Sequence, residues 1–288
     1  MSADTEKGRS TGPLPAARGA AWFMESLALL RRQTSRLLFI AILMQLVLGL
    51  VQVPLLGILV VLSVPGLTAG ILQAFHVTAR GGAPAMRLLF LPLATGNRRG
   101  RLFALGALVF AVGILCVSVI LGGALANVDE ATLLRLQQGD MEALAEVDPL
   151  FMSRLFAAFA FSLAISGTLT FFSVPLVWFR DRGVWPAISA GLGGLLRHWK
   201  ALLVLGLVLA AASLPLVLLI GVLLQMVTAG GVAAYIATGL VMVLLLLFQL
   251  LLFGTQYCSF RDIFGLSEPV PPSGEDGGDD GGNGQLVA

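Results

Sequence analysis

Residues 37–79 read LLFIAILMQLVLGLVQVPLLGILVVLSVPGLTAGILQAFHVTA, a run of 43 residues without a charged side chain. A single straight helix of this length would be ~64 Å long, roughly twice the hydrocarbon thickness of a bilayer. The run therefore has to fold back and cross a membrane twice. The tightest reversal is at Gln52–Pro54 and Gly57, because proline removes a backbone donor and glycine accepts unusual dihedral angles. A turn around Pro65 would leave a second helix too short to cross, so we interpret Pro65 as a kink inside a helix.

Three later stretches have a similar apolar composition, residues 102–126, 155–179 and 201–260. Hydrophobic residues make up 57% of the chain and charged residues 12%, which is too little charge to cover a water-soluble domain of this size. A turn at Thr228–Gly231 divides the last stretch into two. We therefore predict an all-α polytopic membrane protein with six transmembrane helices, at residues 37–53, 55–79, 102–126, 155–179, 201–225 and 232–257.

The segments outside this apolar body are polar. Residues 1–19 lack the apolar core of a secretory signal peptide, and residues 267–288 are rich in Gly and Asp with almost nothing to bury. We expect both to be disordered cytoplasmic tails around a transmembrane domain at residues 20–266. The acidic outer loop at residues 127–154 has apolar residues between its carboxylates. We interpret it as a solvated loop, with short amphipathic helices or weak binding of divalent cations as alternatives.

The distribution of Lys and Arg predicts the orientation. Sixteen of the 18 basic residues fall on one side of the six-helix arrangement, and only Arg135 and Arg154 fall on the other. The sixteen are Lys7, Arg9, Arg18, Arg31, Arg32, Arg36, Arg80, Arg87, Arg98, Arg99, Arg101, Arg180, Arg182, Arg197, Lys200 and Arg261. By the positive-inside rule this side is cytoplasmic, and so are both termini. We therefore predict a multi-pass membrane protein with both termini in the cytoplasm.

Short repeats suggest that the six helices form three hairpins. Arg80–Ala85 after the second helix matches Arg182–Ala187 after the fourth in its Arg, Gly, Pro and Ala positions, and Phe179–Asp181 reappears as Phe260–Asp262. Because each hairpin would begin and end in the cytoplasm, the repeats would be parallel. A gene duplication without functional consequence explains the pattern equally well.

We predict that each hairpin is preceded by a cytoplasmic helix lying in the membrane interface, at Trp22–Gln33, Pro84–Thr95 and Pro186–Trp199. The third shows the pattern best, since one apolar face recurs at helical spacing, formed by Ile188, Leu192, Leu195, Leu196 and Trp199. This is the pattern of a helix that buries one face in acyl chains.

The ends of the fourth and sixth helices supply the candidate structural or interfacial motif, Arg180, Asp181, Arg261 and Asp262. We expect both ends to do the same job. In each, Arg would be directed towards phosphates or a neighbouring helix end, and Asp would pair with a basic residue of the next hairpin. For Arg261 and Asp262 we predict a coupled, partly buried pair.

No pattern in the sequence indicates a catalytic residue, a cofactor site or a metal site. His76, near Gln73, is interpreted as hydrogen-bonded between helices, because the carboxylates that could complete a metal site are confined to loops. The spans contain uncharged polar residues instead: Gln45, Gln52, Gln225, Gln249 and Gln256, and Ser162, Ser166, Thr170 and Ser173 down one face of the fourth helix. We interpret them as helix-packing contacts, and the alternative is a polar path for a small neutral or amphiphilic solute.

Several motifs together resemble a family of uncharacterised bacterial inner-membrane proteins with six spans. They are Trp22 with the Arg31–Arg32 pair, Ala79–Gly81, Arg197–Lys200 and the terminal box Phe260–Phe264. The terminal box, an aromatic-Arg-Asp-Ile-Phe pattern, is the most specific, and it has Phe260 where the family leads us to expect tyrosine. The resemblance covers the folded body. It implies the six-span fold and a location in the bacterial cytoplasmic (inner) membrane, but no activity.

Three functional hypotheses follow. The first is a non-enzymatic scaffold or accessory factor of the bacterial envelope, favoured because the polar content suffices for packing but not for catalysis. The second is a transporter or permease for a neutral or lipid-like solute. The third is a lipid-modifying enzyme at the interface. We expect the lipid bilayer and anionic headgroups at the cytoplasmic face as partners, with a membrane-protein partner or a homo-oligomer also open. We expect no cofactor and no nucleic acid.

Overall fold

The computed structural model describes residues 12–53, 55–125, 132, 134, 135, 138, 151–228 and 231–266. This part of the chain is helical and contains no strand. Its elements are α1 (Arg18–Arg32), α2 (Thr34–Gly49), the 3₁₀ helix η1 (Leu50–Gln52), α3 (Leu56–Ala79), the 3₁₀ helix η2 (Met86–Leu89), α4 (Leu91–Ala94), α5 (Gly96–Leu125), α8 (Phe151–Arg180), α9 (Val184–Arg197), α10 (Trp199–Thr228) and α11 (Gly231–Phe264).

Six stretches are long and apolar enough to span a membrane, judged by length and composition. They are Thr34–Gln52, Leu56–Ala79, Gly96–Ile120, Ser153–Arg180, Trp199–Thr228 and Gly231–Phe264. Each overlaps one of the six predicted spans, which confirms the all-helical class and the number of candidate spans within the described residues.

The reversal between the first two spans lies where the turn residues predict it. The α-helical part of the first span ends at Gly49, and the Gly57 N–H donates to the Val53 carbonyl at 2.9 Å as the chain turns back. Leu55 has a positive φ of 69° just before α3 begins. Pro65 lies inside α3, as expected for a proline tolerated within a span.

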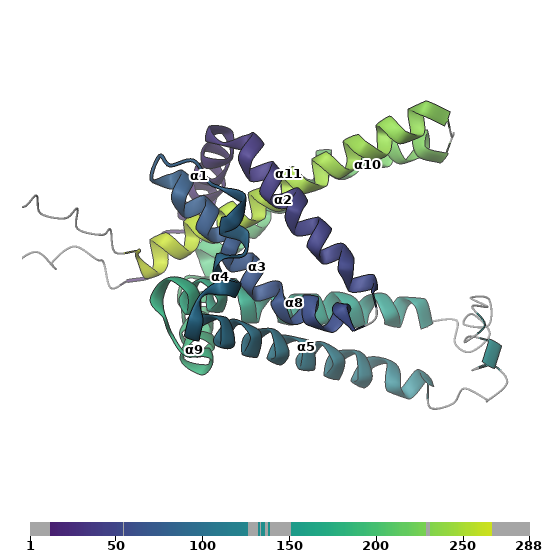
Figure 1. Ribbon diagram of the computed structural model, residues 1–288, viewed down its shortest axis with the longest axis horizontal. Coiled ribbons are helices and arrows are strands. Elements are labelled where there is room, and N and C mark those ends of the chain that lie inside the picture. Colours follow the sequence, from purple (N-terminus) through teal and green to yellow (C-terminus); the bar gives the residue numbers. More distant parts are fainter. Residues whose placement is uncertain are drawn as a thin grey trace, which may run out of the picture.

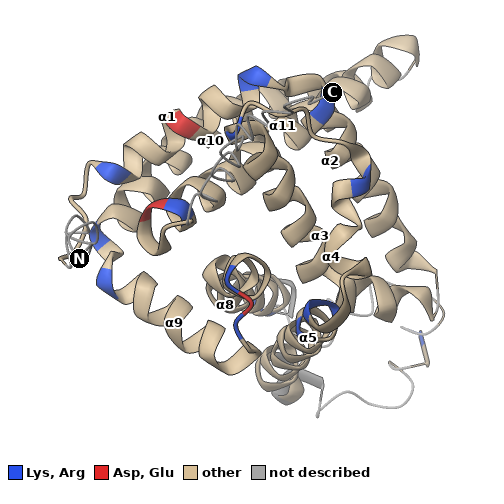
Figure 2. Cartoon of the chain, turned by 60° about the vertical axis from the view of Figure 1, so that its left-hand side comes forward, with Lys and Arg blue, Asp and Glu red and all other residues tan. Residues whose placement is uncertain are grey.

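The helices converge at one end of the molecule and separate at the other. Figure 1 shows the α5 and α8 pair and the α10 and α11 pair meeting on the left and diverging to the right, with α2 crossing between them. We call the converging end the basic end, because α3, α8 and α11 finish there, α5 and α10 begin there, and most described Lys and Arg residues lie there. Figure 2 looks towards it, with Lys and Arg in blue.

The tightly packed core lies in the half of the molecule nearest the basic end. Trp22, Phe75, Phe172, Tyr257 and Phe260 are among its largest fully buried side chains. Close helix contacts here depend on glycine. A Cβ on Gly70 would lie 2.3 Å from the Leu89 carbonyl oxygen, and one on Gly106 would lie 2.2 Å from the Leu62 carbonyl oxygen.

Two of the three segments predicted as interfacial helices differ from the prediction. The segment predicted as one helix at Pro84–Thr95 is instead η2 followed by the single turn of α4. The Leu89 backbone lies against Gly70 there, and Pro92 restarts a helical turn at its first positions. The segment predicted as a helix at Pro186–Trp199 is α9 up to Arg197, and Trp199 already begins α10. Ile188 of α9 is buried in the protein core beside α8, whereas Leu196 of α9 and Trp199 are exposed.

The predicted N-terminal tail is shorter than expected within the described residues. The helix α1 already begins at Arg18, and the Leu14 N–H donates to His198 Nδ1 at 3.1 Å. The rest of the predicted tails, residues 1–11 and 267–288, lies outside the described residues. So does most of the acidic loop at residues 127–154.

Candidate functional site

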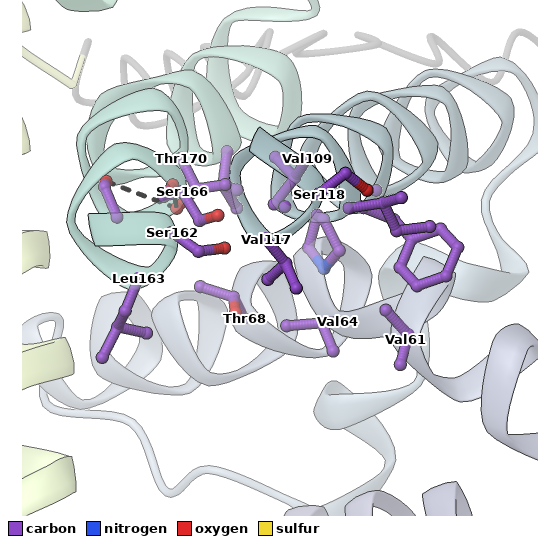
Figure 3. A pocket seen from close by; sticks show the side chains of 17 residues that line it. Val61, Val64, Thr68, Val109, Val117, Ser118, Ser162, Leu163, Ser166 and Thr170 are labelled. Carbon is purple, nitrogen blue, oxygen red and sulfur yellow. Dashed lines mark hydrogen bonds between the residues drawn. The ribbon is translucent and has the colours of Figure 1, made fainter. Parts of the chain in front are cut away.

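A cavity of about 580 Å³ lies between α3, α5 and α8 (Figure 3). Its walls are mostly apolar, formed chiefly by valines and glycines, with five hydroxyl-bearing residues: Thr68, Ser118, Ser162, Ser166 and Thr170. Thr68, Phe110 and Ser166 stand near the midpoints of α3, α5 and α8. The cavity is therefore at mid-depth along the three spans.

The hydroxyls of the cavity are only partly satisfied. Thr170 Oγ1 donates to the Ser166 carbonyl at 2.7 Å, a bond to the carbonyl four residues earlier that is common for threonine in helices. The hydroxyls of Thr68, Ser118, Ser162 and Ser166 have no partner among the described residues. Figure 3 shows Ser162 and Ser166 of α8 facing the same space as Thr68 of α3. The cavity thus presents hydrogen-bonding groups within an apolar wall.

Two sequence features create this space. Gly113 has no side chain, and a Cβ there would lie 3.2 Å from Ser162 Oγ, so a larger residue would fill the gap between α5 and α8. Pro65 also lines the cavity and has no N–H to donate to the carbonyl of Val61, a neighbouring lining residue.

The four predicted hydroxyls of the fourth helix have two different surroundings. Ser162, Ser166 and Thr170 line the cavity, but Ser173 is buried elsewhere, with its hydroxyl 3.2 Å from where a Cβ on Gly191 of α9 would lie. Ser173 thus packs closely against α9, which is the helix-packing role expected of these hydroxyls.

At the basic end, Arg261 and Asp262 belong to one chain of ion pairs that joins α11 to α1. Arg261 Nη2 bonds Glu25 Oε2 at 2.6 Å, and Arg18 Nη2 bonds Glu25 Oε1 at 3.3 Å. Arg18 Nε then bonds Asp262 Oδ2 at 2.8 Å. The Trp22 indole N–H donates to the same Asp262 oxygen at 2.9 Å. The two predicted residues are thus linked through α1, not directly to each other.

Arg180 and Asp181 make different contacts. Arg180 Nη2 donates to the carbonyls of Phe264 and Gly265, at the end of α11, as expected for an arginine directed at a neighbouring helix end. Asp181 Oδ1 accepts from Arg101 Nη1 at 2.9 Å and from Arg98 Nε at 3.3 Å. Both arginines begin α5, which would belong to the same hairpin as α8, so the predicted pairing of Asp181 with the next hairpin is wrong.

The two Phe-Arg-Asp motifs are therefore not equivalent in structure. Asp181 follows the last residue of α8 and has a left-handed φ of 52°, while the Arg182 N–H donates to the Leu176 carbonyl. Asp262 lies inside α11, which continues to Phe264 before Gly265 takes the left-handed conformation. The shared letters occupy different positions relative to the helix end, because α8 ends one turn earlier with respect to its motif.

Polar residues within the spans bond from helix to helix. Gln45 Nε2 donates to Gln249 Oε1 at 2.6 Å, and Gln256 Nε2 donates to the Phe171 carbonyl at 2.7 Å. The Trp178 indole N–H donates to Gln73 Oε1 at 3.0 Å. His76 Nδ1 and Tyr257 Oη are 3.1 Å apart, which confirms the predicted bond between helices for His76.

Two titratable groups outside the spans have pKa values shifted by their surroundings. The hydrogen bond to Asp262 raises the pKa of the Arg18 guanidinium above its ordinary value. Burial lowers the pKa of His198 below its ordinary value of 6.5; nearby Arg197 lowers it further and Asp262 partly offsets this. His198 is therefore neutral at pH 7, which allows Nδ1 to accept the Leu14 N–H. Within the described residues, no three His, Cys, Asp or Glu side chains are grouped as a metal site.

Several of these residues were not singled out from the sequence. Glu25 is the one acidic residue of α1 and Arg18 lies two turns before it, a spacing that places both on one helix face and could have indicated a polar face. Thr68 and Ser118 are isolated hydroxyls on two other helices, and no sequence signal relates them to Ser162.

The six apolar helices place the chain in the class of multi-pass membrane proteins. No protein-family model, curated protein or solved structure matches the chain.

Proposed function

We propose that this chain is a non-enzymatic integral protein of the bacterial inner membrane that binds a neutral, lipid-like solute in the mid-depth cavity. The observation that carries the proposal is the set of unbonded hydroxyls of Thr68, Ser162 and Ser166 in an apolar wall. A hydroxyl in hydrocarbon without a partner is costly, and a ligand hydroxyl or ester carbonyl would provide one.

A neutral solute fits this cavity better than a charged one. None of the described residues that line it is charged, so an ion would lose its hydration without compensation. The acyl part of an amphiphile, by contrast, would contact Val64, Val109 and Val117, which need no polar partner. As an accessory factor of the envelope, the protein would hold such a molecule without converting it.

A permease is the second candidate. Binding sites at mid-depth between helices are typical of secondary transporters, and Thr68, Phe110 and Ser166 lie at that depth. The interfacial enzyme is less well supported, because Arg180, Asp181, Arg261 and Asp262 all bond to other parts of the protein. These residues serve as helix-end contacts.

We also propose the arrangement and orientation that the sequence predicts. The six spans would form three hairpins, each preceded by an interfacial segment, with both termini and the basic end cytoplasmic and close to anionic headgroups. Membership of the six-span family with the terminal aromatic-Arg-Asp-Ile-Phe box is part of this proposal. Reporter fusions after Gly100 and Gly183 should be cytoplasmic and one near Gly139 periplasmic; a cytoplasmic Gly139 reporter would refute the orientation.

Photocrosslinking tests the proposed ligand site. The probe is mono-oleoylglycerol with a diazirine in its acyl chain, added to the full-length protein in detergent. We expect crosslinks on peptides of α3, α5 and α8 that excess unlabelled mono-oleoylglycerol suppresses. Gly113→Leu should abolish them, because the new side chain would occupy the space beside Ser162.

Gly122→Leu is the matched control, since Gly122 lies on the same helix with nothing within 4 Å of an added Cβ. It should crosslink as well as the parent protein. Equal labelling of all six spans, or equal loss in both variants, would show that the cavity is not the binding site.

A further inference from the structure

A second, smaller cavity lies at the basic end, where α2 begins. Its volume is about 320 Å³, and its walls are Arg36 and Phe39 of α2 with Ala83, Pro84, Ala85 and Met86 of the segment after α3. Arg36 and Phe39 are three residues apart and so share one face of α2. One guanidinium thus lies beside an apolar wall.

Arg36 has no partner in the described part of the chain. The described residues include three carboxylates, Glu25, Asp181 and Asp262, and each is already bonded to other arginines. The guanidinium of Arg36 is therefore available to bind an anion in this cavity.

The apolar side of the cavity identifies the kind of anion. Phe39 and Met86 leave 56% and 52% of their surfaces exposed although both are large and hydrophobic. A free phosphate would gain nothing from them. The upper acyl carbons of a lipid would cover both while its phosphate reached Arg36.

We propose that this cavity is a specific site for one anionic phospholipid, with the headgroup phosphate on Arg36 and the glycerol and upper acyl carbons against Phe39 and Met86. Basic pockets of this kind at a membrane surface bind anionic headgroups. The inference rests on the proposed function only in placing the basic end at a membrane surface. It does not depend on what occupies the mid-depth cavity.

Thermal unfolding of the full-length protein in neutral detergent tests the site. Phosphatidylglycerol should raise the Tm in a saturable way, because a ligand that binds only the folded state stabilises it. Phosphatidylcholine and inorganic phosphate should not. Arg36→Gln should weaken the apparent affinity for phosphatidylglycerol about fivefold, the effect of removing one arginine at a lipid surface.

Arg99→Gln is the matched control, because Arg99 is an exposed arginine at the same end, outside the cavity and without a side-chain partner among the described residues. It should retain the parent affinity. Phe39→Ser should also weaken phosphatidylglycerol binding while leaving Arg36 in place. If Arg36→Gln does not fold, crosslinking of a diazirine phosphatidylglycerol to the peptides that contain Phe39 and Met86 in the parent protein decides the matter.

Three results would overturn the proposal. Equal weakening by Arg36→Gln and Arg99→Gln would indicate a diffuse field of positive charge. Equal protection by inorganic phosphate would indicate a simple anion site, and absence of crosslinks at Phe39 and Met86 would place the lipid elsewhere. None of these outcomes bears on labelling by mono-oleoylglycerol, so the two proposals fail independently.

Discussion

Arg18 and Asp262 stand 244 positions apart in the sequence, and Arg18 Nε donates to Asp262 Oδ2 at 2.8 Å. Their side chains are 34% and 25% exposed, so the ion pair alone contributes only about 0–1 kcal/mol. The same carboxylate oxygen also accepts the indole N–H of Trp22, which is fully buried.

We therefore predict that Asp262→Ala lowers the free energy of unfolding by about 1–3 kcal/mol, mainly because the Trp22 N–H loses its acceptor. Asp262→Asn keeps a carbonyl oxygen and should cost less. Thermal unfolding in detergent checks both. The double variant that carries both Trp22→Phe and Asp262→Ala should lose less free energy of unfolding than the sum of the two single variants. A loss equal to that sum would show that the two residues are not coupled.

The bond between Leu14 and His198 predicts a pH dependence of stability. The unfolded chain takes up a proton on this histidine near its ordinary pKa of 6.5, whereas the folded protein does so only at lower pH. Unfolding therefore takes up a proton between those values, and the free energy of unfolding decreases as the pH falls below about 6.5.

His198→Gln retains a neutral acceptor for the Leu14 N–H and should lose this component of the pH dependence. The Tm of both proteins, measured from about pH 7.5 to about pH 5.5, makes the comparison. Identical pH profiles would assign the dependence to another group.

Gly106 controls how closely α3 and α5 approach. Gly106→Ala should destabilise the protein by about 1–3 kcal/mol, because its Cβ would meet the rigid Leu62 backbone and force the helices apart. On the same helix, Gly100 has nothing within 4 Å of an added Cβ, so Gly100→Ala should be neutral or stabilising by up to about 1 kcal/mol. Equal effects of the two substitutions would contradict this packing.

The Gln45 and Gln249 pair should contribute modestly. Hydrogen bonds between transmembrane helices average about 0.6 kcal/mol, so Gln45→Leu and Gln249→Leu should each cost about this much, and the double variant little more than either. Gln225→Leu is the control, since Gln225 is exposed and its side chain has no partner among the described residues. Strictly additive losses would refute the pairing.

The spans could be predicted because their signal is local. A 43-residue apolar run that contains Pro54 and Gly57 leaves few ways of crossing a membrane, and the helices α2 and α3 follow from it. The partners of charged residues could not be predicted, because any of several arginines at one membrane surface could reach Asp262 or Asp181.

The repeated motifs show a second limit of sequence reasoning. Phe179–Asp181 and Phe260–Asp262 have the same letters, yet one Asp follows its helix and the other lies inside it. What differs is the turn that stops each helix, which depends on distant contacts such as Arg180 with the end of α11. The hydroxyl spacing on α8 was visible in the sequence, but the cavity also needs Thr68 and Gly113 from two other helices.

The position of α1 has a consequence for biosynthesis. This helix packs mainly against α10 and α11, and its Arg18, Trp22 and Glu25 all bond to Asp262 or Arg261 near the end of the folded body. The ribosome makes α1 first and Asp262 some 240 residues later. During translation these α1 side chains lack those partners. The contacts between α1 and α11 can form only after the last span has been made. A chain truncated before Arg261 would keep most of the last span, residues 231–260, yet its first helix would lack both Arg261 and Asp262 as partners.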